Sequence, residues 1–204
     1  MRYMQNTYAQ NKEDLFVLNY FGGYTGRVLD IGANDGMTFS NSRLLIENGW
    51  QAVLVEPGTL AHDLYKLYHD NDQVIIHNFG IGSKDEVVRF WESGSHVPGG
   101  IDKGLVSTLD FEETKRWPDV EFVERFARIK PFSSLKKYGP FDFISIDAEG
   151  YDELILKQID LKEAGCQVLC IEWNGDGDLL EKYKDYCHEY QLAVMNGENL
   201  IFVK

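Results

Sequence analysis

The sequence predicts an α/β protein with a mostly parallel sheet that ends in an antiparallel pair of strands. Short apolar or β-branched runs alternate with segments of helical periodicity, which is the pattern of βαβ units. The last two apolar runs flank Asn196-Gly197, and Asn-Gly is a strong hairpin signal. With 204 residues, 44 % of them hydrophobic, the chain is long enough for one core, so we expect a single domain over residues 1–204.

The predicted strands are apolar runs bounded by turn residues, and the strand over 141–146 is the most continuously buried. In chain order they cover residues 27–32, 51–56, 74–78, 87–91, 122–129, 141–146, 168–172, 192–195 and 199–203. Helices are predicted over 38–48, where Gly49 ends the helix, and over 151–159 and 178–190. Another helix follows Pro57 and Gly58 and places one apolar stripe against the sheet: Leu60, Leu64, Leu67 and Tyr68.

Composition limits the partners. The net charge of −13 and the pI of about 4.7 disfavour nucleic acid and anionic membranes, and favour small neutral or polyhydroxyl substrates. No apolar run is long enough to span a membrane or to form a signal peptide, so we expect a cytoplasmic protein. The three cysteines form no CxxC pair and are predicted to be core thiols: Cys166, Cys170 and Cys187. The oligomeric state is not predicted.

The turn after the first strand predicts a ligand-binding loop. Its glycines, Gly32 and Gly36, permit close approach of a ligand, but Asn34 stands where the dinucleotide motif GxGxxG needs a glycine. Asp30, at the end of the strand, opposes a pyrophosphate and suits the ammonium and sulfonium groups of S-adenosylmethionine. We therefore predict an adenosylmethionine loop that includes Asp30, Gly32, Asn34 and Gly36.

Two further polar residues end the next strands. Glu56 stands where a carboxylate accepts the hydroxyls of an adenosine ribose, and Asn78 stands where an amide reaches the adenine edge. Both are also explained as caps of strand ends. NAD enzymes use an acid in the same way as Glu56, so this residue indicates adenosine without choosing the cofactor.

Three segments together resemble the FkbM family of S-adenosylmethionine-dependent methyltransferases. They are VLDIGANDG (28–36), VEP (55–57) and FDFISIDAEGYDELIL (141–156), and residues 8–16 resemble the family's amino-terminal lead-in. The resemblance implies a class I methyltransferase fold, which is a Rossmann-like three-layer sandwich with a seven-stranded sheet. It also implies methylation of a hydroxyl, often on a sugar.

Methylation of a hydroxyl requires a base or a metal, because an alcohol is a poor nucleophile at neutral pH. Asp147 and Glu149, directly after a buried strand, are the predicted catalytic carboxylates. Glu172 and Asn174 end the next strand, so Asp147, Glu172 and Asn174 form a candidate site for Mg²⁺ or another divalent cation. Without a metal, either Asp147 or Glu149 acts directly as the base, or a histidine does, for which His96 in a glycine-rich loop is the candidate.

Residues 94–121 show weak periodicity and are predicted to form a lid or an acceptor-binding element. The candidate acceptor contacts in this stretch are Lys103, Ser107, Thr108, Arg116 and Trp117. On the following strand, Arg125, Arg128 and Lys130 either recognise an anionic substituent or form a solvated face. Two alternatives remain open. One is an NAD-dependent oxidoreductase or epimerase, and the other is a binding module without catalytic activity.

Overall fold

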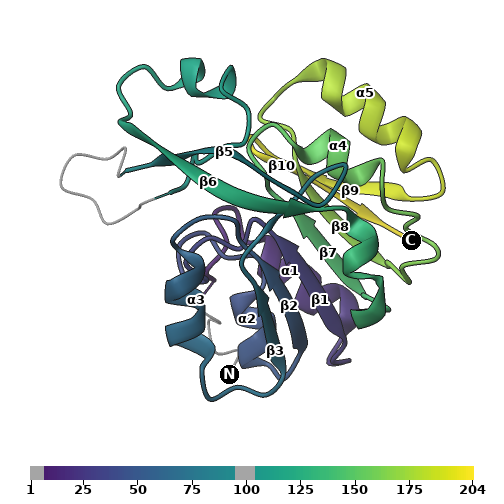
Figure 1. Ribbon diagram of the computed structural model, residues 1–204. Helices are drawn as coiled ribbons and strands as arrows, with labels where there is room; N and C mark the ends of the chain where they lie inside the picture. The colour runs from purple at the N-terminus through teal and green to yellow at the C-terminus, as the bar shows by residue number, and fades with distance from the viewer. Residues whose placement is uncertain (1–6, 95–103) are drawn as a thin grey trace.

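A seven-stranded sheet forms the centre of the computed structural model, which describes residues 7–94 and 104–204 (Figure 1). Its strand order is β3-β2-β1-β7-β8-β10-β9. All neighbours pair in parallel except β10, which is antiparallel to both β8 and β9. These strands are β1 Arg27–Ile31, β2 Gln51–Val55, β3 Val74–His77, β7 Phe143–Ile146, β8 Val168–Glu172, β9 Gln191–Met195 and β10 Asn199–Val203. The predicted sheet and its closing hairpin are confirmed.

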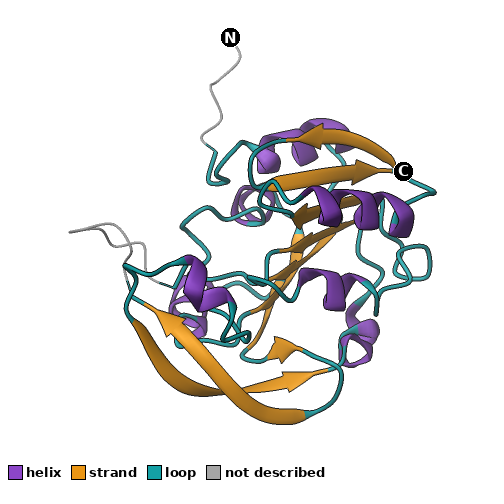
Figure 2. Ribbon diagram, turned by 90° about the horizontal axis from the view of Figure 1, so that it is seen from above, coloured by secondary structure: helices purple, strands orange, loops and turns teal. Residues whose placement is uncertain are grey.

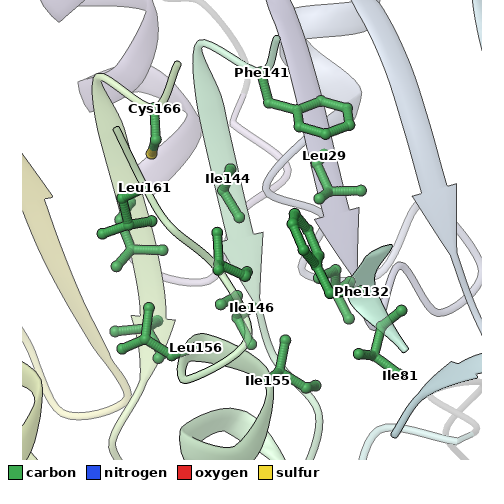
Figure 3. Packing of buried hydrophobic residues seen from close by; sticks show 14 of the residues in the cluster. Leu29, Ile81, Phe132, Phe141, Ile144, Ile146, Ile155, Leu156, Leu161 and Cys166 are labelled. Carbon is green, nitrogen blue, oxygen red and sulfur yellow. The ribbon is translucent and has the colours of Figure 1, made fainter. Parts of the chain in front are cut away.

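Helices cover both faces of this sheet, because successive side chains along a strand point to opposite faces. Val28 and Phe143 belong to a core cluster with residues of α1, α2 and α3. Their neighbours Leu29 and Ile144 point to the other face, where they pack with α4 and α5 (Figure 3). The helices are α1 Glu13–Phe21, α2 Arg43–Glu47, α3 Ala61–Tyr68, α4 Asp152–Leu156 and α5 Gly177–Tyr186. The result is the three-layer arrangement that the sequence predicts.

A second sheet of three strands lies beside the first, with the order β4-β6-β5. Its strands are β4 Gly80–Ile81, β5 Glu86–Ser93 and β6 Phe122–Lys130. The predicted strands over 87–91 and 122–129 are thus confirmed, but they pair with each other in antiparallel fashion and not with the seven-stranded sheet. In Figure 2 this ribbon lies on the opposite side of the molecule from the β9–β10 hairpin.

The helix predicted over 38–48 is mostly wrong, since only Arg43–Glu47 is helical. The Asp35 carboxylate accepts the backbone N–H groups of Met37 and Thr38, both at 2.7 Å, and so holds the chain in a turn. Phe39 then adopts φ +52° and forms a β-bridge with Ala9. The turn comes from side-chain hydrogen bonds of Asp35, and the bridge comes from contact with a distant segment. Apolar periodicity contains no information on either.

The other differences are smaller. The strand predicted over 141–146 begins at Phe143, and the predicted helices over 151–159 and 178–190 shorten to Asp152–Leu156 and Gly177–Tyr186. All three cysteines are free and buried, as predicted for core thiols. Within residues 7–94 and 104–204, no helix is long and apolar enough to cross a membrane.

Candidate active site

A cavity of about 290 Å³ lies at the carboxyl ends of β1, β2, β7 and β8. The chain leaves β1 toward β2 on one side and leaves β7 toward β8 on the other, and such a reversal of strand order opens a crevice in parallel sheets. One carboxylate from each strand end lines the cavity: Asp30, Glu56, Asp147 and Glu172. The predicted site residues at these strand ends are therefore brought together.

The turn after β1 depends on Gly32. This residue has φ +87°, and a Cβ added there would lie 1.7 Å from the carbonyl oxygen of Asp147. The backbone N–H groups of Gly32 and Ala33 both donate to the carbonyl oxygen of Val55, at 2.9 and 3.1 Å. A side chain at position 32 would push the β1 turn away from β7, so glycine is required by close approach.

Asp30 is 4 % exposed and accepts a hydrogen bond from the Ser42 hydroxyl at 2.5 Å. Burial raises the pKa of Asp30 to about 6, and the hydrogen bonds with Ser42 and Ser145 oppose that rise. A buried carboxylate with these neighbours would be stabilised further by a cationic ligand in the cavity.

Glu56 is held by the backbone on both of its carboxylate oxygens. Gly58 N donates to Oε1 at 2.6 Å, and Asn34 N donates to Oε2 at 3.1 Å. Burial raises the pKa of Glu56 to about 7, the two backbone N–H groups lower it, and the charges of Glu92 and Asp30 raise it. The carboxylate is therefore fixed in place at the cavity wall and keeps lone pairs for hydroxyl donors.

Gly36 and Asn78 are not among the described residues that line the cavity. A Cβ on Gly36 would lie 2.6 Å from Leu64 Cδ2, so this glycine permits the loop to pack on α3. The Asn78 amide nitrogen donates to the carbonyl oxygens of Glu56, Pro57 and Gly58 and holds the turn after β2. These contacts show a structural use for both residues, and the predicted contacts of both with the cofactor stay predictions.

Three carboxylates converge at the β7–β8 end of the cavity. One oxygen each of Asp147, Glu149 and Glu172 lies within 4.8 Å of the others. Burial and the neighbouring carboxylate charges raise the pKa of Asp147 to about 8. The same two causes raise the pKa values of Glu149 and Glu172 well above their usual range. At neutral pH the cluster therefore favours a shared proton or a bound cation over three free charges.

Glu149 belongs to this cluster, and its own backbone has a left-handed conformation with φ +47°. Asp152 supports the same turn by accepting the N–H groups of Ala148 and Gly150, at 2.9 and 3.1 Å. Asn174, at φ +48°, also lines the cavity, and its side chain hydrogen-bonds Glu172. The predicted metal ligands Asp147, Glu172 and Asn174 thus lie at one place, and Glu149, predicted only as a catalytic residue, is a further ligand candidate there.

Only some of the residues predicted in 94–121 to contact the acceptor line the cavity. His96 and Lys103 lie outside the described residues. Ser107 and Trp117 line the cavity, together with Leu105 and Leu109 from the same segment. The Thr108 side chain is 1 % exposed, and Arg116 pairs with Glu113 at 2.8 Å. Described residues of this segment between 104 and 117 thus form part of the cavity wall, and the role of the segment as a lid or acceptor-binding element stays a prediction.

The basic residues of β6 serve other contacts. Arg125 pairs with Glu92 at 3.2 Å, and Arg128 pairs with Asp85 at 2.8 Å. The Lys130 ammonium lies 4.8 Å from the centre of the Phe79 ring. None of the three is among the described lining residues, so recognition of an anionic substituent by them stays a prediction.

Sequence reasoning missed the contribution of the amino-terminal segment. Gln10 lines the cavity, while Glu13 and Asp14 are buried at 1 % and 0 % exposure. Asp14 accepts the backbone N–H of Tyr8 at 2.8 Å, and Glu13 accepts the side-chain amide of Asn199 at 2.9 Å. The early acidic pair in the lead-in was visible in the sequence, but the contact of Glu13 with β10 joins segments that are distant in the chain.

The chain matches the methyltransferase FkbM domain family over residues 30–190. Among solved structures it is similar to the METTL16 methyltransferase domain, with a TM-score of 0.53, 11 % identity and coverage of 98 % of this chain and 69 % of that one. It is similar to the putative methyltransferase yhhF from Escherichia coli, with a TM-score of 0.53, 10 % identity and coverage of 99 % and 90 %. A methyltransferase from Geobacter sulfurreducens gives a TM-score of 0.51 at 9 % identity, with coverage of 97 % and 80 %. No curated protein matches the chain in sequence. At these identities the solved structures report the fold alone.

Proposed function

This chain belongs to the FkbM methyltransferase family, and from that premise we propose that it transfers a methyl group from S-adenosylmethionine to a hydroxyl oxygen of a carbohydrate or glycosylated small molecule. The observation that carries the proposal is the cavity itself. It combines a carboxylate placed to accept ribose hydroxyls, Glu56 at the end of β2, with a separate group of carboxylates that includes Asp147 and Glu149, at the end of β7 on the other side of β1.

The residues present fit S-adenosylmethionine. Asp30 and Glu56 are buried acids on the cavity wall, and the pKa of each is raised by burial. An ammonium or sulfonium near Asp30 would offset that cost, and ribose hydroxyls would donate to Glu56. Gly32 and Asn34 line the same wall. The charged side chains of this wall are acidic among the described residues, which disfavours a diphosphate.

When bound, S-adenosylmethionine supplies a methyl carbon that its sulfonium has already activated. The protein then has to hold the acceptor hydroxyl in line and remove its proton. Asp147 and Glu149 line the cavity, and a base works best when its pKa lies near the working pH. We therefore assign proton removal to the carboxylate pair Asp147 and Glu149, whose pKa values are both raised and which accept the proton in the ionised state.

A divalent cation is the alternative way to lower the pKa of the acceptor hydroxyl. Asp147, Glu149 and Glu172 supply hard oxygen ligands within 4.8 Å of one another, and Asn174 lies beside them. A cation such as Mg²⁺ would also relieve the repulsion that raises their pKa values. We propose these residues as its ligands, with the role of orienting the acceptor oxygen.

The charge of the cavity favours an uncharged small acceptor. Its described lining residues include no lysine, arginine or histidine, and they carry the acids Asp30, Glu56, Asp147, Glu149, Glu172 and Glu198. Such a wall repels phosphate groups, so nucleic acid is disfavoured as an acceptor. Trp117 offers a flat apolar surface to a sugar ring.

The test is turnover with a panel of acceptors. The purified protein is incubated with S-adenosylmethionine and each of a set of methyl glycosides, amino sugars, a nucleoside monophosphate and a short RNA, and release of S-adenosylhomocysteine is measured. We expect release with at least one neutral glycoside and none above background with the nucleoside monophosphate or RNA. Turnover confined to RNA would overturn the acceptor assignment, while the methyltransferase assignment would stand.

A further inference from the structure

Through two consecutive residues, Trp91 and Glu92, strand β5 of the second sheet contacts Thr108 and Thr59, which neighbour the two ends of the cavity in the chain segments that line it. Trp91 exchanges two backbone hydrogen bonds with Thr108, at 2.9 and 3.0 Å. Glu92, one residue later, contacts Thr59 in the turn after β2. Trp91 uses its backbone groups, which lie in the plane of the sheet, whereas Glu92 uses its side chain, which points out of that plane. The two neighbouring residues can therefore contact different segments. The sequence pattern predicted the two long strands of this sheet but not their contacts with the cavity segments.

At the acceptor end, Thr108 holds Glu149. The Thr108 hydroxyl donates to the Glu149 carbonyl oxygen at 2.7 Å and accepts Asp110 N at 2.9 Å. Its side chain is 1 % exposed, so the hydroxyl is directed at these partners and not at an acceptor. Glu149 needs such support, since φ +47° is a sparsely populated conformation for a residue with a side chain. Losing the bond would free Glu149 to move out of the carboxylate cluster.

At the cofactor end, Glu92 holds the turn that carries Glu56. One Glu92 oxygen accepts both Thr59 N and Thr59 Oγ1, each at 2.6 Å, and the other pairs with Arg125 at 3.2 Å. Gly58, between Glu56 and Thr59, donates to Glu56 Oε1. A Cβ on Gly58 would lie 2.9 Å from Glu56 Oε1 and 3.1 Å from Glu92 Oε1. The two carboxylates therefore both lie close to the Cα of this glycine.

We propose that β5 is a brace that positions both ends of the site, with Thr108 as the positioning residue for Glu149 and Glu92 as the positioning residue for the Glu56 turn. The inference rests on the proposed function, because it assigns Glu149 to the acceptor and Glu56 to the cofactor. Neither positioning residue touches a reacting atom. The two contacts serve different ends, so their loss should affect different kinetic parameters.

The first test removes the hydroxyl of Thr108 with little change in shape. Thr108→Val is expected to lower kcat about tenfold or more, because a displaced catalytic group is slow even when substrate is bound. The Kd of S-adenosylhomocysteine, measured by calorimetry, should stay within about twofold, and Thr108→Ser should recover most of kcat because it keeps the hydroxyl. Turnover uses the best glycoside from the acceptor panel.

The second test removes the Glu92 carboxylate. Glu92→Ala is expected to raise the Kd of S-adenosylhomocysteine about tenfold, which corresponds to about 1.4 kcal/mol, while kcat at saturating donor stays within about twofold. Glu92→Gln should restore most of the affinity, since its amide oxygen also accepts from Thr59. The matched control is Glu124→Ala, which truncates an exposed partner of Arg89 on β6 and should change neither parameter.

The separation of the two effects decides the inference. A fall in kcat with Thr108→Val and a rise in Kd with Glu92→Ala, each rescued by its conservative variant, supports the brace. If kcat and Kd change together in either variant, or neither changes, the brace is wrong. A wild-type protein that neither binds S-adenosylhomocysteine nor releases it from S-adenosylmethionine overturns the proposed function first, and the assigned roles of Glu149 and Glu56 fall with it.

Discussion

At the β1–β2 end of the cavity the carboxylates accept hydrogen bonds, whereas at the β7–β8 end they face one another. Asp30 accepts from Ser42, and Glu56 accepts from the backbone of Asn34 and Gly58. At the other end, after the effect of burial, the charge of Asp147 raises the pKa of Glu149, and the charges of Asp147 and Glu149 raise the pKa of Glu172. The first arrangement is a preformed set of acceptors for a ligand, and the second is a site whose charge changes when it takes up a proton or a cation.

The largest expected effect tests this division at the β7–β8 end. Asp147→Ala should lower kcat by about 10²- to 10⁴-fold, because the acceptor proton loses its base or its bound cation. The Kd of S-adenosylhomocysteine should change by less than about threefold, since its proposed contacts lie at the other end. Turnover and calorimetry on the same preparation measure both. Unchanged turnover would remove Asp147 from the mechanism.

The complementary change lies at the β1–β2 end. Glu56→Ala removes the acceptor proposed for the ribose hydroxyls and releases the N–H groups of Asn34 and Gly58. We expect the Kd of S-adenosylhomocysteine to rise by about 10- to 100-fold. The kcat at saturating donor should fall far less than in Asp147→Ala. Glu47→Ala, which truncates an exposed partner of Arg43 on α2, is the control and should leave Kd unchanged. A Kd that does not move with Glu56→Ala would contradict the ribose assignment.

Metal addition tests whether the carboxylate cluster takes up a cation. Mg²⁺ titrated into chelator-treated protein should raise the melting temperature and bind with one site per chain. Glu172→Gln should weaken that binding by about tenfold, because it removes one charged ligand of the three. Turnover that persists after exhaustive chelation, with no binding heat, would leave direct base catalysis by Asp147 and Glu149 as the mechanism.

The raised pKa values predict how stability of the ligand-free protein depends on pH. Asp30, Glu56 and Asp147 have folded-state pKa values of about 6, 7 and 8, above their ordinary values, so the folded state binds more protons than the unfolded state. Their protonation stabilises the fold fully below about pH 4, and this contribution is lost as pH rises toward 8.

We therefore expect the melting temperature to be about 5 °C lower at pH 8 than at pH 5. Asp147→Asn, which cannot ionise, should show a shallower decline than the wild type. Differential scanning calorimetry at matched ionic strength measures both slopes. Equal slopes in the two proteins would show that Asp147 does not titrate in this range.

Much of the fold was predictable because local patterns agree with it. Apolar runs, turn glycines and Asn196-Gly197 locate the seven strands and the final hairpin. The site was partly predictable for the same reason, since parallel strands bring their carboxyl ends together and place Asp30, Glu56, Asp147 and Glu172 around one cavity.

The remainder depends on contacts between distant segments. Periodicity over 38–48 resembles a helix, but Asp35 and the bridge of Phe39 with Ala9 hold its first part as a loop. Nothing local in 87–91 or 122–129 shows that these strands form their own sheet. The uses of Thr108 and Glu92 likewise depend on Glu149 and Thr59, which lie more than thirty residues away in the chain.

The central claim is that the turn after β1 and the Glu56 carboxylate form a site for an adenosylmethionine donor and not for a dinucleotide. Calorimetric titration of the wild-type protein with S-adenosylhomocysteine and, separately, with NAD tests it most directly. The account predicts saturable one-to-one binding of S-adenosylhomocysteine and no binding heat with NAD at the same concentrations. Saturable binding of NAD together with no binding of S-adenosylhomocysteine would contradict it.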